Sequence, residues 1–433
     1  DAFRAVLPRA TGTEYDVTHR GDSFYIRTND QAQGFRVIEA PVADPARSNW
    51  TEMIPARTGV TVEMVVAFQD YLVTEEREAG LMQIRIRDLR TGGVHHVEFP
   101  EATYTAGIGP NAEFNTKLLR FHYTSLVTPE SVYDYNMEAR ARELKKQKTV
   151  LGGYDPAQYQ SERLFALAAD GVEVPVSIVY KKGFIRDGRA PLLLYGYGSY
   201  GISSDPAFSS NVLSLLNRGF AYAIAHIRGG MDLGKPWHED GRLLKKKNTF
   251  TDFIAAAERL VALQYTSPGR LAITGGSAGG LLMGAVINMR PDLFAAVVTR
   301  VPFVDSLNTA LDATLPLTVG EYEEFGNPQE PEFYHYMKSY APYENVTAQE
   351  YPAILVTAGL NDPRVSYWEP AKWTAKLRAM KTDTRPLLLK TNLDAGHFGA
   401  SGRYEYLKEI AFNYAFLLSV LGVEGTGGTT PLS

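Results

Sequence analysis

The stretch Leu271-Ala-Ile-Thr-Gly-Gly-Ser277-Ala-Gly-Gly280 decides the fold of the larger part of the chain. An apolar strand leads into Gly-x-Ser-x-Gly, and a helical pattern follows over residues 279–289. Glycines permit a sharp turn from strand to helix, and such a turn holds a serine hydroxyl exposed above the sheet. The helix N-terminus then favours developing negative charge. The pattern predicts Ser277 as a nucleophile; a glycine-rich turn with an idle serine is the alternative.

Apolar runs and helical patterns alternate on both sides of this stretch. The runs are short and almost wholly apolar, which is typical of buried parallel strands. They cover residues 191–195, 221–226, 271–274, 295–300, 353–357 and 386–390, and the helical patterns cover 252–263, 279–289, 370–380 and 403–421. Two further strands, 162–168 and 172–180, precede them around Asp170-Gly171. The sequence therefore predicts an α/β domain that binds its ligand at the carboxyl ends of the strands.

A serine hydroxyl is a weak nucleophile without a base, so we expect a histidine on a later loop. His397 follows the last predicted strand; His226 also ends a strand, but it precedes the serine in the chain. An acid must hold the imidazole, and Asp362 lies just past an apolar run. Asp394, on the same short loop as the histidine, is the alternative acid. Serine, aspartate and histidine then follow the chain order of α/β-hydrolases.

The loop Gly196-Tyr197-Gly-Ser-Tyr-Gly201 matches the pattern G-x-G-x-x-G of dinucleotide-binding proteins. That pattern requires a helix directly after the glycines, and here residues 202–206 intervene. The loop follows an apolar strand at the place where α/β-hydrolases build half of their oxyanion hole. We therefore expect it to contribute to an oxyanion hole rather than to bind a dinucleotide.

The first 148 residues contain a repeat. Residues 24–28, 71–75 and 119–123 are alike, 47 and then 48 residues apart, and a second alternating run follows each. A period of roughly 40–50 residues is typical of propeller blades, with an accidentally regular sandwich as the alternative. Three blades cannot close a ring. We therefore expect blades to be missing before Asp1, where the chain opens without Met, and a charged linker over residues 137–160.

The composition excludes several classes of protein. The 433 residues carry a net charge of −5, with 45% hydrophobic and 21% charged residues, so neither disorder nor nucleic-acid binding is expected. The lysine runs at 145–146 and 245–247 are interpreted as solvated faces. The absence of cysteine excludes disulfides, thiolate metal sites and a cysteine nucleophile. No segment is long enough to span a bilayer. We expect no cofactor, metal or membrane partner, and a cytoplasmic location.

Together these motifs resemble the prolyl oligopeptidase family. The matching segments are 195–201 (YGYGSYG), 226–230 (HIRGG), 245–250 (KKKNTF), 275–280 (GGSAGG), 320–328 (GEYEEFGNP) and 394–399 (DAGHFG). The resemblance covers residues 160–423 and extends more weakly through the repeat. It implies an α/β-hydrolase domain over 149–433, capped by a seven-bladed propeller. Residues 1–148 would hold its C-terminal blades, and the N-terminal portion of the propeller would be missing from this chain.

The resemblance also implies roles for further residues. The Tyr197 hydroxyl and the Ala278 backbone N–H would bind the oxyanion, and Arg364 would hold a substrate carbonyl. Several matching segments are typical of a subfamily in which Glu321 and Glu323 select Arg or Lys before the scissile bond. The last implied substrate-binding residue is Asp205; because Ala207 replaces a second aspartate, a weaker preference for paired basic residues is expected.

Charge supports this specificity independently of the resemblance. Two carboxylates in a cleft oppose each other's ionisation, and a guanidinium relieves that cost; a solvated acidic turn is the alternative interpretation. We therefore expect a serine oligopeptidase that hydrolyses short peptides after Arg or Lys through an acyl-enzyme, with a propeller that restricts substrate size. Cleavage after proline, release of an acylated amino terminus and small-ester hydrolysis are alternatives within enzymes. A non-catalytic binding module is the alternative outside them.

Overall fold

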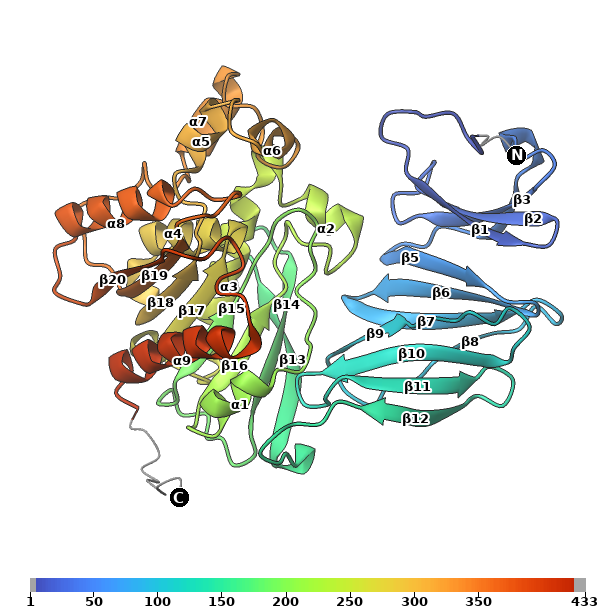
Figure 1. Ribbon diagram of the computed structural model, residues 1–433, viewed down its shortest axis with the longest axis horizontal. Helices are drawn as coiled ribbons and strands as arrows, with labels where there is room; N and C mark the ends of the chain where they lie inside the picture. Colours follow the sequence, from blue (N-terminus) through green and yellow to red (C-terminus); the bar gives the residue numbers. More distant parts are fainter. Residues whose placement is uncertain (1–4, 424–433) are drawn as a thin grey trace. The chain divides into compact units, whose positions relative to one another are not determined.

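The computed structural model describes residues 5–423, which form two compact units (Figure 1). Within the described residues, unit 1 comprises 5–154 and two short segments, 205–208 and 231–237. Unit 2 comprises 155–204, 209–230 and 238–423. The first short segment is a loop, and the second includes the first three residues of a short helix, 235–239. Both segments interrupt unit 2 along the chain.

Unit 1 consists of three antiparallel sheets of four strands, and within each sheet the strands pair in chain order. The repeated segments form the second strand of each sheet, β2, β6 and β10, which confirms the repeat. The first sheet holds β1 (Tyr15–Arg20), β2 (Ser23–Thr28), β3 (Arg36–Pro41) and β4 (Thr51–Ile54). The second holds β5 (Val60–Ala67), β6 (Tyr71–Glu78), β7 (Leu81–Asp88) and β8 (Val94–His96). The third holds β9 (Tyr104–Ile108), β10 (Leu118–Ser125), β11 (Ser131–Asn136) and β12 (Ala141–Gln147).

Neighbouring sheets of unit 1 pack face to face through alternate side chains of their strands. Val73 and Ile84 of the second sheet share one buried cluster with Leu119 and Phe121 of the third. Another buried cluster joins Tyr25 and its neighbours in the first sheet to residues of β5 and β6. Four-stranded sheets stacked in this way are the blades of a propeller, as the repeat predicts.

The predicted linker over 137–160 is wrong in its first half, because β12 lies there. This strand pairs antiparallel with β11, and all seven of its side chains are exposed. It lies at the edge of its sheet, so it needs no apolar face and carries the charges that commonly protect an edge. Because its sequence is mainly polar, hydrophobic alternation could not predict this strand.

Unit 2 is built around one eight-stranded sheet in the order β13-β14-β16-β15-β17-β18-β19-β20. The antiparallel pair β13 and β14 forms one end, β14 pairs antiparallel with β16, and the remaining pairs are parallel. The bounds are β13 (Tyr159–Leu167), β14 (Glu173–Lys181), β15 (Leu192–Tyr195), β16 (Ala221–Ala225), β17 (Leu271–Gly276), β18 (Ala296–Arg300), β19 (Ala353–Gly359) and β20 (Leu387–Asn392). Every strand predicted for this domain is confirmed.

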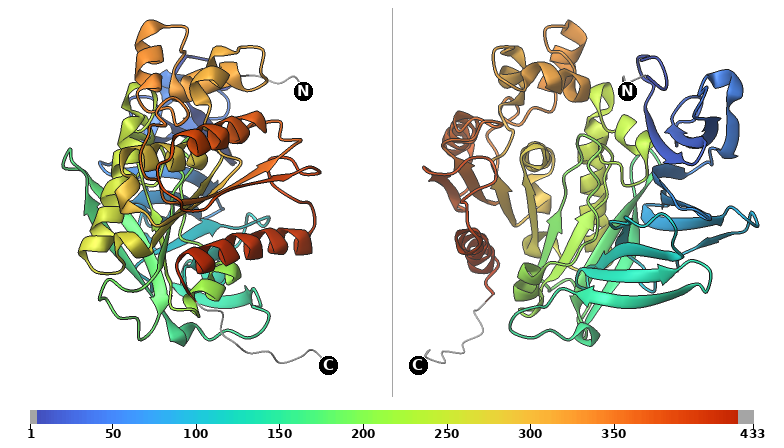
Figure 2. Two further views of the ribbon diagram at one scale, coloured as in Figure 1. Left: turned by 90° about the vertical axis from the view of Figure 1, so that its left-hand side faces the viewer. Right: turned by 45° about the vertical axis from the view of Figure 1, so that its right-hand side comes forward.

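Helices cover both faces of this sheet (Figure 2). Leu215 of α1 and Leu417 of α9 share one buried cluster with Ala272 and Leu355 of the sheet, whereas α3 and α4 pack against each other and against the sheet. The helices are α1 (Ser210–Leu216), α2 (Lys235–Glu239), α3 (Lys247–Ala262), α4 (Ala278–Met289), α5 (Ser306–Leu311), α6 (Thr318–Phe325), α7 (Pro331–Lys338), α8 (Trp368–Met380) and α9 (Arg403–Val420). Unit 2 is thus the predicted α/β-hydrolase domain.

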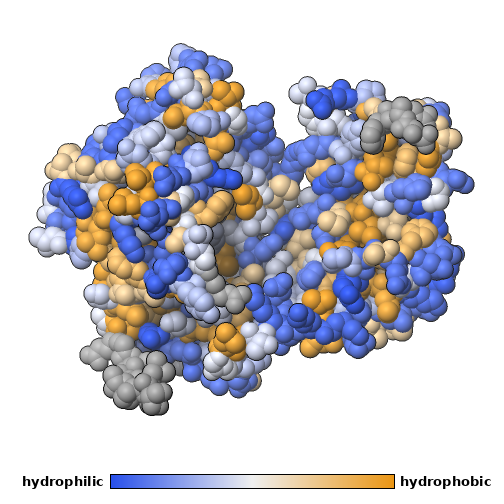
Figure 3. Space-filling model, viewed as in Figure 1, coloured by the Kyte–Doolittle hydropathy of each residue, from blue (hydrophilic) through white to orange (hydrophobic). Residues whose placement is uncertain are grey.

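Hydrophobic side chains also reach the surface of unit 2, over β20 and α9 (Figure 3). Leu388 and Leu393 are 45% and 65% exposed, and Leu407 and Phe412 of α9 are about two-fifths exposed. Among residues 5–423, no helix combines the length and the apolar character that crossing a membrane requires.

Candidate active site

Ser277 lies between the last residue of β17 and the first residue of α4. Its backbone adopts φ 57° and ψ −121°, a region that residues other than glycine rarely occupy. The Ser277 N–H donates to the Arg300 carbonyl at 2.9 Å, which fixes the turn against the neighbouring strand β18. A strained serine conformation held by its surroundings in this way is typical of a nucleophile at a strand-to-helix turn.

The glycines around Ser277 are required by close packing. A Cβ atom on Gly275 would lie 2.5 Å from the Gly279 carbonyl oxygen. A Cβ atom on Gly280 would lie 2.4 Å from Cα of Pro302. The close approach of these backbones, rather than chain flexibility, therefore explains the glycine-rich sequence of the turn.

His397 and Asp362 are joined by a short hydrogen bond. The His397 Nδ1 atom lies 2.7 Å from Oδ2 of Asp362, and the aspartate side chain is fully buried. Its other oxygen accepts the backbone N–H groups of Arg364 at 2.8 Å and Val365 at 3.0 Å. Burial opposes ionisation of Asp362, but the hydrogen bonds from His397 and from the two N–H groups hold its pKa below the usual range. The carboxylate is therefore ionised at neutral pH and orients the imidazole.

The alternative residues do not take part in this arrangement. His226 is buried, and its Nε2 atom lies 2.7 Å from the hydroxyl of Ser177 in the neighbouring strand β14. Asp394 is exposed, and its backbone N–H donates to Asn392. Ser277 and His397 instead line the same cavity of about 700 Å³, next to the carboxyl ends of β17 and β19.

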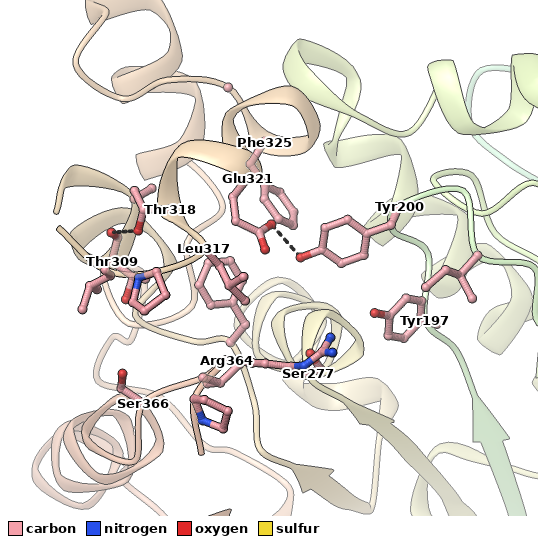
Figure 4. Close-up of a pocket in the computed structure, with 18 residues that line it drawn as sticks. Tyr197, Tyr200, Ser277, Thr309, Leu317, Thr318, Glu321, Phe325, Arg364 and Ser366 are labelled. Carbon is pink, nitrogen blue, oxygen red and sulfur yellow. Dashed lines mark hydrogen bonds between the residues drawn. The ribbon is translucent and has the colours of Figure 1, made fainter. Parts of the chain in front are cut away.

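Ser277 also lines a second cavity, of about 300 Å³ (Figure 4). Tyr197, Arg364 and Glu321 line it together with apolar side chains. The apolar part of the lining includes Phe303, Leu315, Leu317 and Phe325. The wall of this mostly apolar cavity thus contains one carboxylate, the guanidinium of Arg364 and the candidate nucleophile.

Tyr197 lies on the loop after β15, and its hydroxyl points into this cavity (Figure 4). Burial, followed by the neighbouring Tyr195 and Glu321, raises the pKa of Tyr197 to about 12. The phenol therefore stays protonated at neutral pH and can donate a hydrogen bond. Ala278 is the first residue of α4, so its backbone N–H belongs to the helix turn whose N–H groups have no intrahelical acceptor.

Glu321 lies on α6 and accepts a hydrogen bond from the Tyr200 hydroxyl at 2.7 Å. Burial raises the pKa of Glu321, whereas the Tyr200 hydrogen bond lowers it and the neighbouring Glu324 raises it further. The net effect is a raised pKa, so the surroundings of this carboxyl disfavour its charged form. A cation beside Glu321 would remove that penalty.

The structure does not bring Glu323 or Asp205 to this cavity. Glu323 is exposed, and its backbone carbonyl accepts a hydrogen bond from Arg242 at 3.1 Å. Asp205 belongs to unit 1, where its carboxylate lies 3.0 Å from the Arg77 guanidinium. Arg77 is buried and also pairs with Glu63 at 2.6 Å. Substrate-binding roles for Glu323 and Asp205 remain predictions from the sequence.

Three side chains beside the cavity were given no functional role from the sequence. Glu324 is buried on α6, with His238 Nε2 at 2.7 Å and Lys246 Nζ at 3.7 Å. Lys246 is only 1% exposed, so the interpretation of residues 245–247 as a solvated face is wrong at its central residue. No sequence signal joins these residues, because 78 or more positions separate Glu324 from its two partners.

Comparison with known proteins is consistent with this geometry. The family model described as "Prolyl oligopeptidase family" matches residues 206–424. The chain belongs to the prolyl oligopeptidase family. The model for the N-terminal β-propeller domain of the same family matches residues 1–148. This match contradicts the expectation that a propeller portion is missing: the N-terminal propeller domain is present, and its described residues form the three sheets of unit 1.

Several members of the family are similar to the chain along nearly all of its length. It is 45% identical over 423 residues to a dipeptidyl aminopeptidase BI of Pseudoxanthomonas mexicana and 44% identical over 422 residues to a protease 2 of Moraxella lacunata. These alignments cover 97% and 98% of this chain, but 58% and 61% of the relatives.

Solved structures give the same result. Oligopeptidase B from Leishmania major is 45% identical, with a TM-score of 0.90 over 96% of this chain and 60% of that one. Oligopeptidase B from Trypanosoma brucei, with covalently bound antipain, is 43% identical, with a TM-score of 0.91 over 97% of this chain and 61% of that one. This chain therefore spans about three fifths of the length of these relatives.

Proposed function

We propose that this protein is a serine oligopeptidase, similar to oligopeptidase B, that hydrolyses short peptides after Arg or Lys. The observation that carries the proposal is a single carboxylate, Glu321, in the wall of an apolar cavity that also contains Ser277. An arginine side chain fits such a cavity, because its aliphatic stem packs on apolar walls while its guanidinium reaches the carboxylate. The uncharged ring of proline would leave the partly buried Glu321 without a cationic partner, which disfavours the alternative specificity.

Ser277 acts as the nucleophile and His397 as the base. Because Nδ1 of His397 is held by Asp362, the other ring nitrogen, Nε2, takes the hydroxyl proton as the serine oxygen attacks the scissile carbonyl. The resulting imidazolium is stabilised by the carboxylate and then gives its proton to the leaving amine. The acyl-enzyme that remains is hydrolysed when a water molecule repeats the same steps.

The oxyanion formed during attack is bound by Tyr197 and Ala278. The high pKa of the phenol keeps its proton in place, and the N–H of Ala278 lies at a helix N-terminus, where negative charge is favoured. Arg364 lines both cavities beside Ser277 and is exposed, so it can bind a carbonyl of the substrate backbone. The names of the relatives, dipeptidyl aminopeptidase BI, protease 2 and oligopeptidase B, support peptide hydrolysis as the reaction.

Covalent labelling tests the nucleophile. We expect a fluorophosphonate probe to modify Ser277 in the intact protein, as read by peptide mass spectrometry, and the Ser277→Ala variant to remain unlabelled. Ser339→Ala is the matched control, because Ser339 is a serine outside both cavities. A folded protein without label at Ser277 would rule out the peptidase and favour a binding module.

Substrate size is tested separately. We propose that the propeller restricts access, so that an arginine-containing peptide of about ten residues is cleaved and the same sequence in a surface loop of a folded protein is not. Comparable cleavage of both substrates would rule out the size restriction while leaving the peptidase proposal intact.

A further inference from the structure

Glu324 is a buried carboxylate that the proposed reaction does not use. Its Oε1 atom accepts the backbone N–H of Tyr200 at 2.8 Å, and its Oε2 atom lies 2.7 Å from His238 Nε2. Burial raises its pKa, but His238, Lys246 and the Tyr200 N–H lower it by more, so the net pKa lies below the usual range. Removing one partner of a buried ion pair is costly, because the remaining charge is still buried and keeps its desolvation penalty.

Lys246 holds two further residues of the same loop. Its Nζ atom donates to the Gly198 carbonyl at 2.6 Å and to the Ser199 hydroxyl at 2.8 Å. The ammonium also lies 3.7 Å from Glu324 and 5.3 Å from the centre of the Phe325 ring. The positive and negative partners of this pair thus bind successive residues of one loop, 198–200.

This loop carries the candidate oxyanion donor. Tyr197 directly precedes the three held residues, and the centres of the Tyr197 and Tyr200 rings lie 6.4 Å apart. Tyr200 has φ 59°, in the left-handed region that a tyrosine adopts only at a cost. Such a conformation persists when the surroundings impose it, and here the hydrogen bond from its N–H to Glu324 does so.

The same helix carries the candidate specificity residue. Glu321 and Glu324 are three positions apart on α6, so both face one side of it. Tyr200 binds both of them, Glu321 through its hydroxyl and Glu324 through its N–H. Figure 4 shows the Tyr200 ring between helix α6 and the loop of Tyr197. Helix α6 and this loop are therefore joined at one residue by two hydrogen bonds.

We propose that Glu324 is a positioning residue for the oxyanion hole, and that Lys246 and His238 hold it ionised and in place. The inference rests on the proposed function, because it assigns Tyr197 as an oxyanion donor. Catalysis by a preorganised donor depends on its position, and a misplacement of about 1 Å costs on the order of 10²-fold in rate. Loss of the Glu324 charge therefore lowers turnover of every substrate, whichever residue precedes the scissile bond.

Glu324→Gln is the first test, because glutamine keeps the shape of the side chain and removes its charge. Turnover is measured in the intact protein with an Arg-containing peptide amide and with a small neutral ester, each normalised to the active sites titrated by a serine-reactive probe. We expect kcat to fall by about 10- to 100-fold on both substrates, while KM for the peptide changes by less than about threefold. Affinity for a peptide aldehyde, which mimics the oxyanion, should fall together with kcat.

Lys246→Met is the second variant, and it tests the proposal if Glu324→Gln does not fold. It removes the donor to Gly198 and Ser199 of the same loop, so it should give the same loss of kcat per titrated site. Glu332→Gln, at an exposed glutamate of α7, is the matched control for the loss of one carboxylate. Circular dichroism and the thermal midpoint separate a loss of folded protein from a loss of turnover.

Three results would overturn the inference. Unchanged kcat per titrated site in a folded variant would reduce Glu324 to a structural role. A rise in peptide KM with normal ester turnover would assign it to substrate binding together with Glu321. A wild-type protein that neither labels nor turns over either substrate would overturn both this inference and the proposed function, whereas the first two results would leave the proposed function in place.

Discussion

The hydroxyl of Tyr200 donates a hydrogen bond to Oε2 of Glu321 at 2.7 Å, in the wall of the cavity that Ser277 also lines. Hydrogen bonds to charged groups contribute about 1.5–3 kcal/mol, so this one favours the ionised form of Glu321 appreciably. Burial and the nearby Glu324 act in the opposite direction and raise its pKa. The charged form of Glu321 is therefore destabilised when no cation lies beside it, and a cationic substrate side chain would stabilise it.

Tyr200→Phe should shift the pH dependence of arginine recognition. Without the hydroxyl, the pKa of Glu321 rises further, and the carboxylate is protonated at a higher pH as the solution is acidified. We expect the acid limb of kcat/KM for an Arg-containing peptide to move to higher pH, because this limb reports groups of the free enzyme. The limb measured with a neutral ester should move less. An equal shift for both substrates would show that the Tyr200 hydroxyl acts on catalysis rather than on Glu321.

Asp362→Asn should reduce kcat by on the order of 10⁴-fold with little change in KM. The amide can present a donor to Nδ1 of His397, which favours the tautomer that cannot accept the serine proton. Asp394→Asn, on the same loop as the histidine, is the comparison, because Asp394 is exposed and does not pair with His397. The assignment of the acid fails if the Asp394 variant loses as much kcat as the Asp362 variant.

Tyr197→Phe should cost about 3 kcal/mol of transition-state stabilisation, a loss of roughly 10²- to 10³-fold in kcat. The phenol donates only to the developing oxyanion, so KM should stay nearly constant and peptide-aldehyde affinity should fall. Tyr404→Phe, at an exposed tyrosine of α9, controls for loss of a hydroxyl elsewhere in unit 2. Unchanged kcat in the Tyr197 variant would mean that other donors bind the oxyanion.

Glu369 should make the stability of the protein fall as pH rises. Burial raises its pKa from 4.5 to about 7, although its oxygens accept the Thr309 hydroxyl and the Asp305 N–H. Between these two values the folded state binds more protons than the unfolded state, so the free energy of unfolding decreases with increasing pH. The shift corresponds to about 3 kcal/mol once pH exceeds the folded pKa.

Glu369→Gln removes this titration. We expect thermal midpoints measured at several values between pH 5 and pH 8 to decline less steeply in the variant than in the wild type, so that their difference grows with pH in favour of the variant. Parallel slopes for the two proteins would contradict the raised pKa of Glu369.

The fold was largely predictable because its signals are local. Each strand of the parallel sheet is a short apolar run, and the pattern Gly-x-Ser-x-Gly that marks the turn at Ser277 lies within ten residues of sequence. His397 and Asp362 each follow such a run, so topology alone brings them to one edge of the sheet. The edge strand β12 gave no such signal, because an exposed strand needs no apolar alternation.

The surroundings of the site were less predictable, because they depend on contacts between distant residues. In the run 245–247, three consecutive lysines look alike, yet Lys246 is buried because its ammonium meets Glu324 and the carbonyl of Gly198. In the segment Glu321-Tyr-Glu-Glu324, the resemblance implied Glu321 and Glu323 as the specificity pair, and the role of Glu323 stays a prediction. The structure adds that helical geometry turns Glu321 and Glu324 to one side of α6 and leaves Glu323 exposed.

The proposed specificity at Glu321 is tested by kcat/KM for short fluorogenic peptides that differ only in the residue before the cleaved bond. Arg, Lys, Pro, Phe and Ala should be compared in the wild type and in Glu321→Gln, with Ser277→Ala as the blank. We predict a strong preference for Arg and Lys in the wild type, and in the variant a loss of that preference while the low rates on Phe and Ala persist. Turnover of Pro or Phe at rates comparable to Arg, or a preference for Arg that survives in Glu321→Gln, would contradict the account.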